Sequence, residues 1–260
     1  MKSIQTVLVR CVLVVTVIAL TGCVWLRLLE VKHQLADFDD HVRVQVADRH
    51  FILNLLHPVL LSEDFVYLTK LHPSRVTSSP EGYRWFVDFR IDPAASKEQA
   101  GKTIVFAMTF TPDHRLAAFD FSPLFLEMAP AAFLEASIRS LGVGKVDQGK
   151  NQLKVDAEDL PKLSARLPSR QAILAVMGPP AEQFPQDDLK GLLYRFKADA
   201  APVEPKYEKR RIAEVKLFFD PHSDELVRLA GRFAGLKLAI DYRKFALPKD
   251  SDHDRTARAD

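Results

Sequence analysis

The sequence predicts an α+β fold in which antiparallel sheets carry helices packed on one face, built as two related helix-plus-sheet units in tandem. Three observations support this prediction. Several stretches alternate apolar and polar residues with the period of two that a half-buried strand shows. Other stretches carry apolar residues at helical spacing and end at glycine or proline. The order helix, strand, long loop and hairpin also occurs twice along the chain.

The first unit is expected over residues 41–160 and begins with a strand pair. Valines alternate with polar residues at 42–46, and a short apolar run follows at 51–56. A helix is predicted next, with Ser62 as its N-cap, because a serine hydroxyl accepts hydrogen bonds from the free backbone N–H groups of the first turn. Pro73 is expected to end this helix.

Three strands and a second helix complete the first unit. Residues 83–91 alternate apolar and charged side chains, and the stretches 104–110 and 116–121 are predicted to be the next strands, joined by a proline turn. A helix then begins at Pro130 and is expected to stop at Gly142, since proline suits the first turn of a helix and glycine the position past its end.

The second unit is expected over residues 161–247 and follows the same order. Ser169 is predicted to cap a helix that ends at 178–180, where the sequence Gly-Pro-Pro stops it. Strands are predicted at 192–196 and 213–219, and two further alternating stretches complete the sheet.

Matching landmarks in the two units lie at nearly equal distances along the chain. Pro73 and Pro179 are 106 residues apart (179 − 73), and Phe110 and Phe219 are 109 apart (219 − 110). Both phenylalanines precede a proline turn and another strand. Small insertions therefore suffice to align the units, which predicts a structural repeat. The alternative is that proline turns between amphipathic strands are commonplace.

The N-terminus has the pattern of an export signal. A basic start is followed by an unbroken apolar run at 11–20 and then by small residues. The segment Leu20-Thr21-Gly22-Cys23 resembles the bacterial lipobox, whose cysteine becomes the new amino terminus and carries the lipid. This resemblance implies a signal peptide at 1–22, lipidation of Cys23 and a periplasmic protein that is lipid-anchored in the bacterial cell envelope.

An uncleaved membrane helix is the alternative. Arg10 and Arg27 bound sixteen residues, just short of the roughly 17 to 25 of a spanning helix, and such an anchor would place the protein in the inner membrane. For a lipidated protein, Val24 after the cysteine implies the periplasmic face of the outer membrane, by analogy with Gram-negative sorting. Apolar residues continue at helical spacing to Phe38, which predicts a membrane-proximal helix at 23–40.

Composition excludes several classes of protein. Cys11 lies in the predicted signal peptide and Cys23 would carry the lipid, so no thiol remains for a disulfide, a thiolate metal site or a cysteine nucleophile. Removal of residues 1–22 leaves 34 basic residues against 34 acidic ones. A neutral chain with interspersed charges lacks the basic surface that nucleic acid requires, so no nucleic-acid partner is expected. The charged tail at 248–260 is expected to be disordered.

The second half resembles the small outer-membrane lipoproteins of the SmpA/OmlA (BamE) type. The resemblance rests on a short helix ending Met177-Gly178-Pro179-Pro180, an aromatic strand around Tyr194 and Phe196, and a strand ending Leu217-Phe218-Phe219 before a turn. It implies helices packed on one face of an antiparallel sheet. Two such units in tandem are similar to the beta-lactamase inhibitor protein fold, whose concave sheet binds another protein.

No motif for catalysis or metal binding stands out. The eight histidines form neither a His-Glu-x-x-His helix nor a Cys/His cluster, so no metal and no cofactor is expected. The segment Gly142-Val143-Gly144-Lys145 lacks the first glycine and the hydroxyl residue of a phosphate loop. Ser122 and Ser137 lie in no nucleophile motif. We expect no catalytic residues, with an unrecognised hydrolase as an alternative.

The expected function is therefore binding. Phe86 is predicted to face away from the core, beside Arg84 and Asp88, and is the candidate contact for a protein partner. The first hypothesis is a non-catalytic envelope lipoprotein that binds a protein partner in outer-membrane or cell-envelope assembly and maintenance. The alternative is a periplasmic carrier or sensor of an apolar ligand, suggested by the 17 phenylalanines.

Overall fold

The computed structural model describes residues 24–91, 102–147, 152–154 and 162–245. The predicted signal peptide at 1–22, the lipidation site Cys23 and the tail at 248–260 lie outside these residues. No helix within them is long and apolar enough to cross a membrane. The described helices are a helix over 24–36, called here the N-terminal helix, α2 (Phe38–His41), α3 (Ser62–Thr69), α4 (Pro123–Leu126), α5 (Ala131–Val143), α6 (Arg170–Met177), and the 3-10 helices η3 (Pro205–Arg211) and η4 (Tyr242–Lys244).

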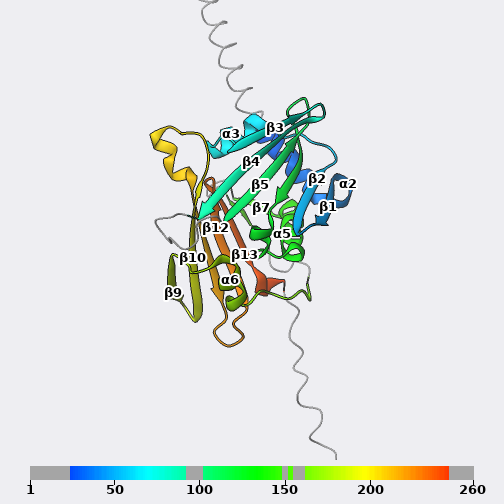
Figure 1. Ribbon diagram of the computed structural model, residues 1–260. Coiled ribbons are helices and arrows are strands. Elements are labelled where there is room, and N and C mark those ends of the chain that lie inside the picture. The colour runs from blue at the N-terminus through cyan, green and yellow to red at the C-terminus, as the bar shows by residue number, and fades with distance from the viewer. Residues whose placement is uncertain (1–23, 92–101, 148–151, 155–161, 246–260) are drawn as a thin grey trace, which may run out of the picture.

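The strands confirm the α+β fold. They are β1 (Val42–Ala47), β2 (His50–Leu55), β3 (Arg75–Ser79), β4 (Gly82–Ile91), β5 (Thr103–Phe110), β6 (Leu116–Phe121), β7 (Lys145–Asp147), β8 (Gln152–Lys154), β9 (Glu182–Gln186), β10 (Leu189–Ala198), β11 (Ile212–Phe219), β12 (Leu226–Phe233) and β13 (Leu236–Asp241). Eleven of the described strands form one antiparallel sheet with the order β1-β2-β6-β5-β4-β10-β11-β12-β13, in which β3 pairs with β4 and β9 with β10 (Figure 1). β7 and β8 form a separate hairpin.

The order of elements occurs twice within this sheet. The first series is α3-β3-β4-β5-β6 and the second is α6-β9-β10-β11-β12. β4 and β10 are each ten residues long and begin 107 residues apart (189 − 82). The two strands also pair with each other, and Arg90 lies opposite Lys197, again 107 residues later (197 − 90). The two series therefore share one sheet and meet where β4 pairs with β10.

β4 illustrates how the alternating pattern produces a half-buried strand. Val87, Phe89 and Ile91 are buried on the side that we call the inner face. Arg84 and Arg90 are exposed on the opposite side, the outer face. Successive side chains of a strand point to opposite faces of the sheet, so the apolar set turns inward as a group.

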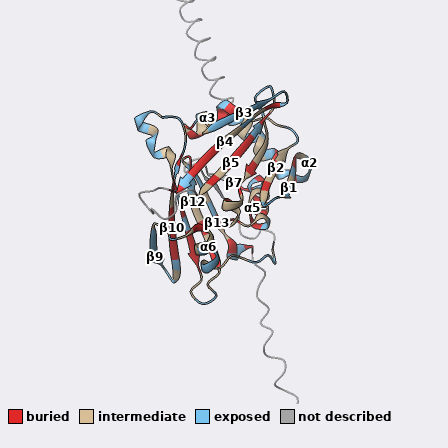
Figure 2. Cartoon of the chain, viewed as in Figure 1, coloured by how far each residue is buried: buried red, intermediate tan, exposed pale blue. Residues whose placement is uncertain are grey.

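The sheet is strongly curled. Three strands lie between β5 and β12, which corresponds to about 19 Å in a flat sheet at roughly 4.8 Å per strand. The rings of Phe106 in β5 and Phe233 in β12 nevertheless have centroids 5.3 Å apart. Curling brings the two ends of the inner face together around one hydrophobic core, and Figure 2 shows buried residues along the strands of both series.

The helices pack on the inner face, as predicted. Phe65 of α3 meets the edge of Trp85, with ring centroids 6.5 Å apart. Phe133 of α5 packs against Tyr242 of η4 at 5.2 Å. The Tyr242 hydroxyl donates a hydrogen bond to the Met128 carbonyl oxygen at 2.6 Å, and burial raises the pKa of this tyrosine above its usual value. These contacts join the last helix to the segment after α4.

Two helix ends differ from the prediction. Ser62 is the first residue of α3 and makes no capping bond with its side chain; Asp64 instead accepts a hydrogen bond from the Leu61 N–H at 2.9 Å. Gly142 does not end α5, which continues for one more residue. A Cβ atom at Gly142 would lie 2.3 Å from the backbone of Leu35. Glycine is therefore required here by the close approach of the N-terminal helix, not by helix termination.

The pattern of the sequence does not reveal β3 and β9. All five residues of β3 are exposed, and β9 contains Pro185, so neither strand alternates buried and exposed residues. Both are the first arms of hairpins whose second arms, β4 and β10, carry the buried residues. The sequence favours a connection over 144–159, with a short strand at 153–155 as an option; the structure has β8 there, over Gln152–Lys154, paired with β7.

Candidate functional site: an apolar cavity on the inner face

The inner face carries a cavity of about 430 Å³. Its size lies in the range of roughly 300–1,000 Å³ that is typical of small-molecule sites. Its lining residues come from three groups of elements. These are the N-terminal helix with α3 and the residues before it, then β4, β5, β6 and α4, and then the end of β12 with the start of β13. The cavity therefore occupies the space that the curled sheet encloses beside the helices.

Phenylalanine rings make up much of the cavity lining. Phe106 lies at the centre of this group, and its ring centroid is 5.3 Å from those of Phe125 and Phe233. The rings of Phe119 and Phe121 are 5.9 Å and 5.8 Å from it. Offset and edge-to-face rings leave carbon and hydrogen atoms facing the cavity and no hydrogen-bonding groups of their own. Such a surface suits an aliphatic chain.

An ion pair joins the N-terminal helix to α3 in the wall of the cavity. Arg27 donates from Nε and Nη2 to the two carboxylate oxygens of Asp64, at 2.6 Å and 2.5 Å. The side chain of Asp64 is 2% exposed and that of Arg27 17%. Asp64 also accepts the Leu61 N–H, so three donors satisfy its buried charge. Leu28, the residue after Arg27, lines the cavity.

The start of β13 provides the rim of the cavity. Leu236, which is 52% exposed, lies there with Lys237 and Leu238. Among the described residues, no carboxylate forms an ion pair with Lys237. Because Arg27 neutralises Asp64, Lys237 is the lining residue that keeps an unpaired charge.

Phe86 lies on the outer face and does not line the cavity. Its ring is partly buried, and the guanidinium carbons of Arg75 and Arg84 lie 3.8 Å and 5.3 Å from its centroid. Arg75 also pairs with Asp88 at 3.3 Å. The role of Phe86 in binding a partner stays a prediction. Cys23, the predicted lipidation site, precedes the first described residue of the N-terminal helix.

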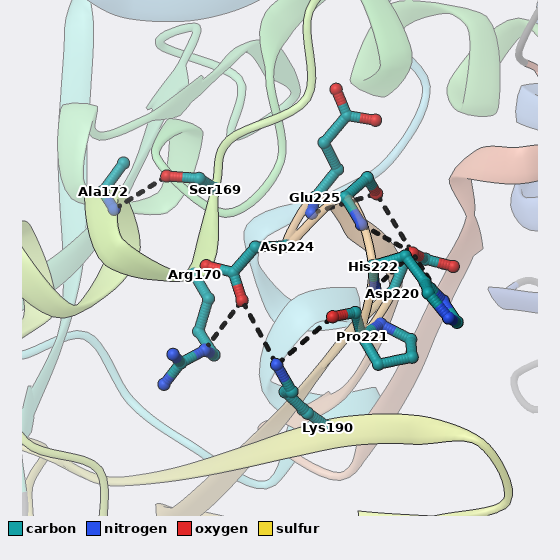
Figure 3. A network of polar contacts seen from close by, with 10 residues as sticks. Ser169, Arg170, Ala172, Lys190, Asp220, Pro221, His222, Asp224 and Glu225 are labelled. Carbon is teal, nitrogen blue, oxygen red and sulfur yellow. Dashed lines mark hydrogen bonds and ion pairs between the residues drawn. The ribbon is translucent and has the colours of Figure 1, made fainter.

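A polar network at the second unit connects α6 to the turn between β11 and β12 (Figure 3). Ser169 caps α6, as predicted, because its hydroxyl oxygen accepts the Ala172 N–H at 3.1 Å. Arg170 Nε donates to Asp224 at 3.0 Å, and Lys190 Nζ lies 3.9 Å from the same carboxylate. This network holds the start of α6 against the sheet.

The turn itself is stabilised by Asp220. Its carboxylate accepts the backbone N–H groups of Ser223 and His222, both at 2.9 Å, and these hydrogen bonds hold the pKa of Asp220 below its usual value. The side chain of His222 is 94% exposed. It is a solvated turn residue.

His50 and Asp120 form an acid-base pair on the outer side of β2 and β6. His50 Nδ1 lies 2.8 Å from one oxygen of Asp120, and Arg84 donates to the other at 2.7 Å. In the described ranges, no serine, threonine or cysteine side chain hydrogen-bonds to His50. Groups of three or more His, Cys, Asp or Glu side chains that could hold a metal ion are also absent from those ranges.

The sequence indicates the strands that line the cavity but not the cavity itself. Alternation in 83–91 and 104–110 correctly assigns their apolar residues to a buried face. Periodicity does not show how closely the helices approach that face. The Arg27–Asp64 pair holds the N-terminal helix against α3 and so sets this distance. Arg27 interrupts an apolar helical stretch, Asp64 is buried in α3, and the two are 37 residues apart in the sequence.

No family model matches the chain, and no curated protein or solved structure is significantly similar to it. The resemblance of the second unit to SmpA/OmlA-type lipoproteins stays a prediction from the residues that carry it.

Proposed function

We propose that this protein is an envelope lipoprotein that holds one long acyl chain in the apolar cavity, as a carrier or sensor of an apolar ligand. The observation that carries the proposal is the cavity with its phenylalanine lining. The export signal expected at 1–22 and the lipid expected on Cys23 support it, because an envelope membrane is a source of acyl chains.

The volume of the cavity supports a single chain. A protein cavity of about 150 Å³ lined by aliphatic and aromatic residues holds benzene, which has six carbon atoms. The cavity here is about 430 Å³, roughly three times larger, and by proportion holds about 18 carbon atoms. One fatty acyl chain has this size, whereas the two chains of a phospholipid exceed it.

Burial of such a chain yields a useful affinity. Each buried methylene contributes about 0.8 kcal/mol, so sixteen of them contribute about 13 kcal/mol. Loss of translational freedom and ordering of the chain cost at least about 4–6 kcal/mol of this. The net is then at most about 7–9 kcal/mol, which corresponds to a Kd on the order of 1 μM or weaker.

Lys237 favours a ligand with an anionic head. Lys237 is an exposed lining residue between Leu236 and Leu238, at the edge where the polar end of a chain buried in the cavity would emerge. A fatty acid should therefore bind more tightly than the alcohol of the same chain length, and Lys237→Gln should remove that preference. A preference that survived the substitution would contradict this orientation of the ligand.

A cavity-filling variant tests the proposal. Leu116 lines the cavity, and Leu116→Trp would exclude about two methylenes, which costs about 1.6 kcal/mol or roughly 10- to 15-fold in Kd. Leu56→Trp is the matched control, since Leu56 is 43% exposed and does not line the cavity. Native mass spectrometry of the full chain with added oleate measures the bound fraction. Equal binding by the two variants would exclude this cavity as the site.

Binding of a protein partner in envelope assembly or maintenance is a second proposal. It is supported by Phe86, which stays partly exposed on the outer face between Arg75 and Arg84, since aromatic residues and arginines are enriched where partners bind most strongly. A photocrosslinker at Phe86 should capture a specific partner in intact cells, whereas one at the exposed Val46 should not. Identical products at both positions would argue against this interface.

A further inference from the structure

The first turns of the N-terminal helix are apolar on two opposite sides. On the inner side, Val24 is 8% exposed and Leu28 lines the cavity. On the outer side, Trp25, Leu26 and Leu29 are 57%, 67% and 49% exposed. A helix with apolar residues on two sides is normally covered on both, because each exposed apolar side chain forgoes the free energy of burial. The outer side of these turns is thus an unpartnered apolar surface on the described chain.

This surface ends sharply along the helix. Glu30 directly follows Leu29, and His33 lies one turn after Leu29 on the same side; both are polar and exposed. Leu29 and His33 are separated by four residues, or about 6 Å along the axis at 1.5 Å per residue. The apolar part of the outer side therefore lies at the end of the helix nearest to the N-terminal segment of the chain.

We propose that the lipid bilayer covers Trp25, Leu26 and Leu29, and that the boundary between the bilayer and water lies between Leu29 and His33. The inference rests on the membrane address in the proposed function and is independent of the ligand in the cavity.

The chain outside the described residues identifies the bilayer as the occupant. The apolar run at 11–20 and Cys23 directly precede the helix. A lipid on Cys23 and an uncleaved membrane helix both bring residue 24 to a membrane, so the proposal holds for either form of attachment. Tryptophan is enriched at the membrane–water interface because its ring is apolar and its N–H is polar, which suits Trp25.

One consequence concerns the cavity. Leu28 faces the cavity while Leu29 faces the bilayer, so a single helix separates the two. With side chains a helix is about 10–12 Å across. An acyl chain that moves from the membrane to the cavity therefore crosses a distance of only one helix diameter.

Tryptophan fluorescence tests the position of the boundary. The protein has two tryptophans, Trp25 and Trp85. In a chain with both replaced by phenylalanine, Leu29→Trp provides a reporter on the proposed bilayer side of the boundary and His33→Trp a matched reporter one turn away on the water side. Each full-length variant is reconstituted into phosphatidylcholine vesicles and exposed either to brominated acyl chains within the bilayer or to aqueous iodide.

The proposal expects opposite results at the two positions. Brominated chains should quench the reporter at 29 at least about twofold more than the one at 33, and iodide should do the reverse, since the interface lies between them. Equal quenching by iodide at both positions, or protection of both from both quenchers by a protein partner or a second copy, would overturn the proposal. Failure of the protein to float with vesicles would overturn the membrane address as well.

A second measurement tests the proposal in case the double tryptophan replacement or a reporter substitution prevents folding. Trp85→Phe alone leaves Trp25 as the natural reporter, and circular dichroism checks that the fold is retained. Trp25 should then show quenching by brominated chains and little quenching by iodide. Full access of iodide to Trp25 in vesicle-bound protein would contradict the proposal without any change to the N-terminal helix.

Discussion

Replacement of Asp64 by alanine should loosen the wall of the cavity and destabilise the fold. The change removes the two Asp64 oxygens that accept from the Arg27 guanidinium and the acceptor of the Leu61 N–H. Breaking a buried ion pair by removal of one partner costs about 3–5 kcal/mol. Because the Arg27 side chain is 17% exposed and water relieves part of its charge, we expect about 3 kcal/mol. At about 2–4 °C per kcal/mol for a protein of this size, Tm should fall by about 6–12 °C.

Calorimetry on two matched variants measures this effect. Asp39→Ala is the control, since Asp39 also pairs with an arginine, Arg139, at 2.7 Å, but its side chain is 83% exposed. An exposed pair contributes little to stability, so this variant should keep a Tm close to that of the unchanged protein. Amide exchange across 24–36 should rise in Asp64→Ala alone. Equal Tm values for the two variants would refute the role assigned to the ion pair.

Three further predictions concern local structure. Gly142→Ala should lower stability by about 1–3 kcal/mol although alanine favours helices, because its Cβ would lie 2.3 Å from the backbone of the N-terminal helix; a higher denaturation midpoint would contradict this. Ser169→Ala should lower the free energy of unfolding by about 1 kcal/mol because it removes the N-cap of α6, and Ser62→Ala should lower it by less. Chemical denaturation of both variants measures the difference, and a larger loss for Ser62→Ala would invalidate the assignment of the caps. The pKa of Asp220 is lowered chiefly by the hydrogen bond from the Ser223 N–H, so the ionised carboxylate stabilises the fold fully above the usual pKa of 3.8, and this stabilisation is lost as pH falls below that value. Asp220→Asn should therefore remove this part of the pH dependence of Tm. An unchanged pH profile of Tm would contradict the role assigned to Asp220.

Local chemistry allowed much of the sheet to be predicted. β4, β5 and β11 each have one buried and one solvated face, so their apolar residues recur with a period of two that is visible in one sequence. Ser169 was identifiable because N-capping depends on a residue and its next turn. The repeat was detectable because both units place similar turns at similar spacing.

Other features depend on contacts between distant residues and leave no local pattern. β3 is held by its backbone pairing with β4 while all its side chains stay exposed. Gly142 resembles a helix stop in sequence, and its requirement comes from a helix more than 100 residues away. The cavity arises from the curl of the sheet and from the Arg27–Asp64 pair, neither of which periodicity encodes.

Photolabelling tests the central claim, that the inner-face cavity holds an acyl chain. A fatty acid with a diazirine near the end of its tail is bound to the full-length protein, irradiated, and located by peptide mass spectrometry. Labels are expected on the lining segments of β5, β6 and α4, at Phe106, Phe121 and Phe125. Labels concentrated on the outer face around Phe86, or spread evenly over the surface, would contradict it.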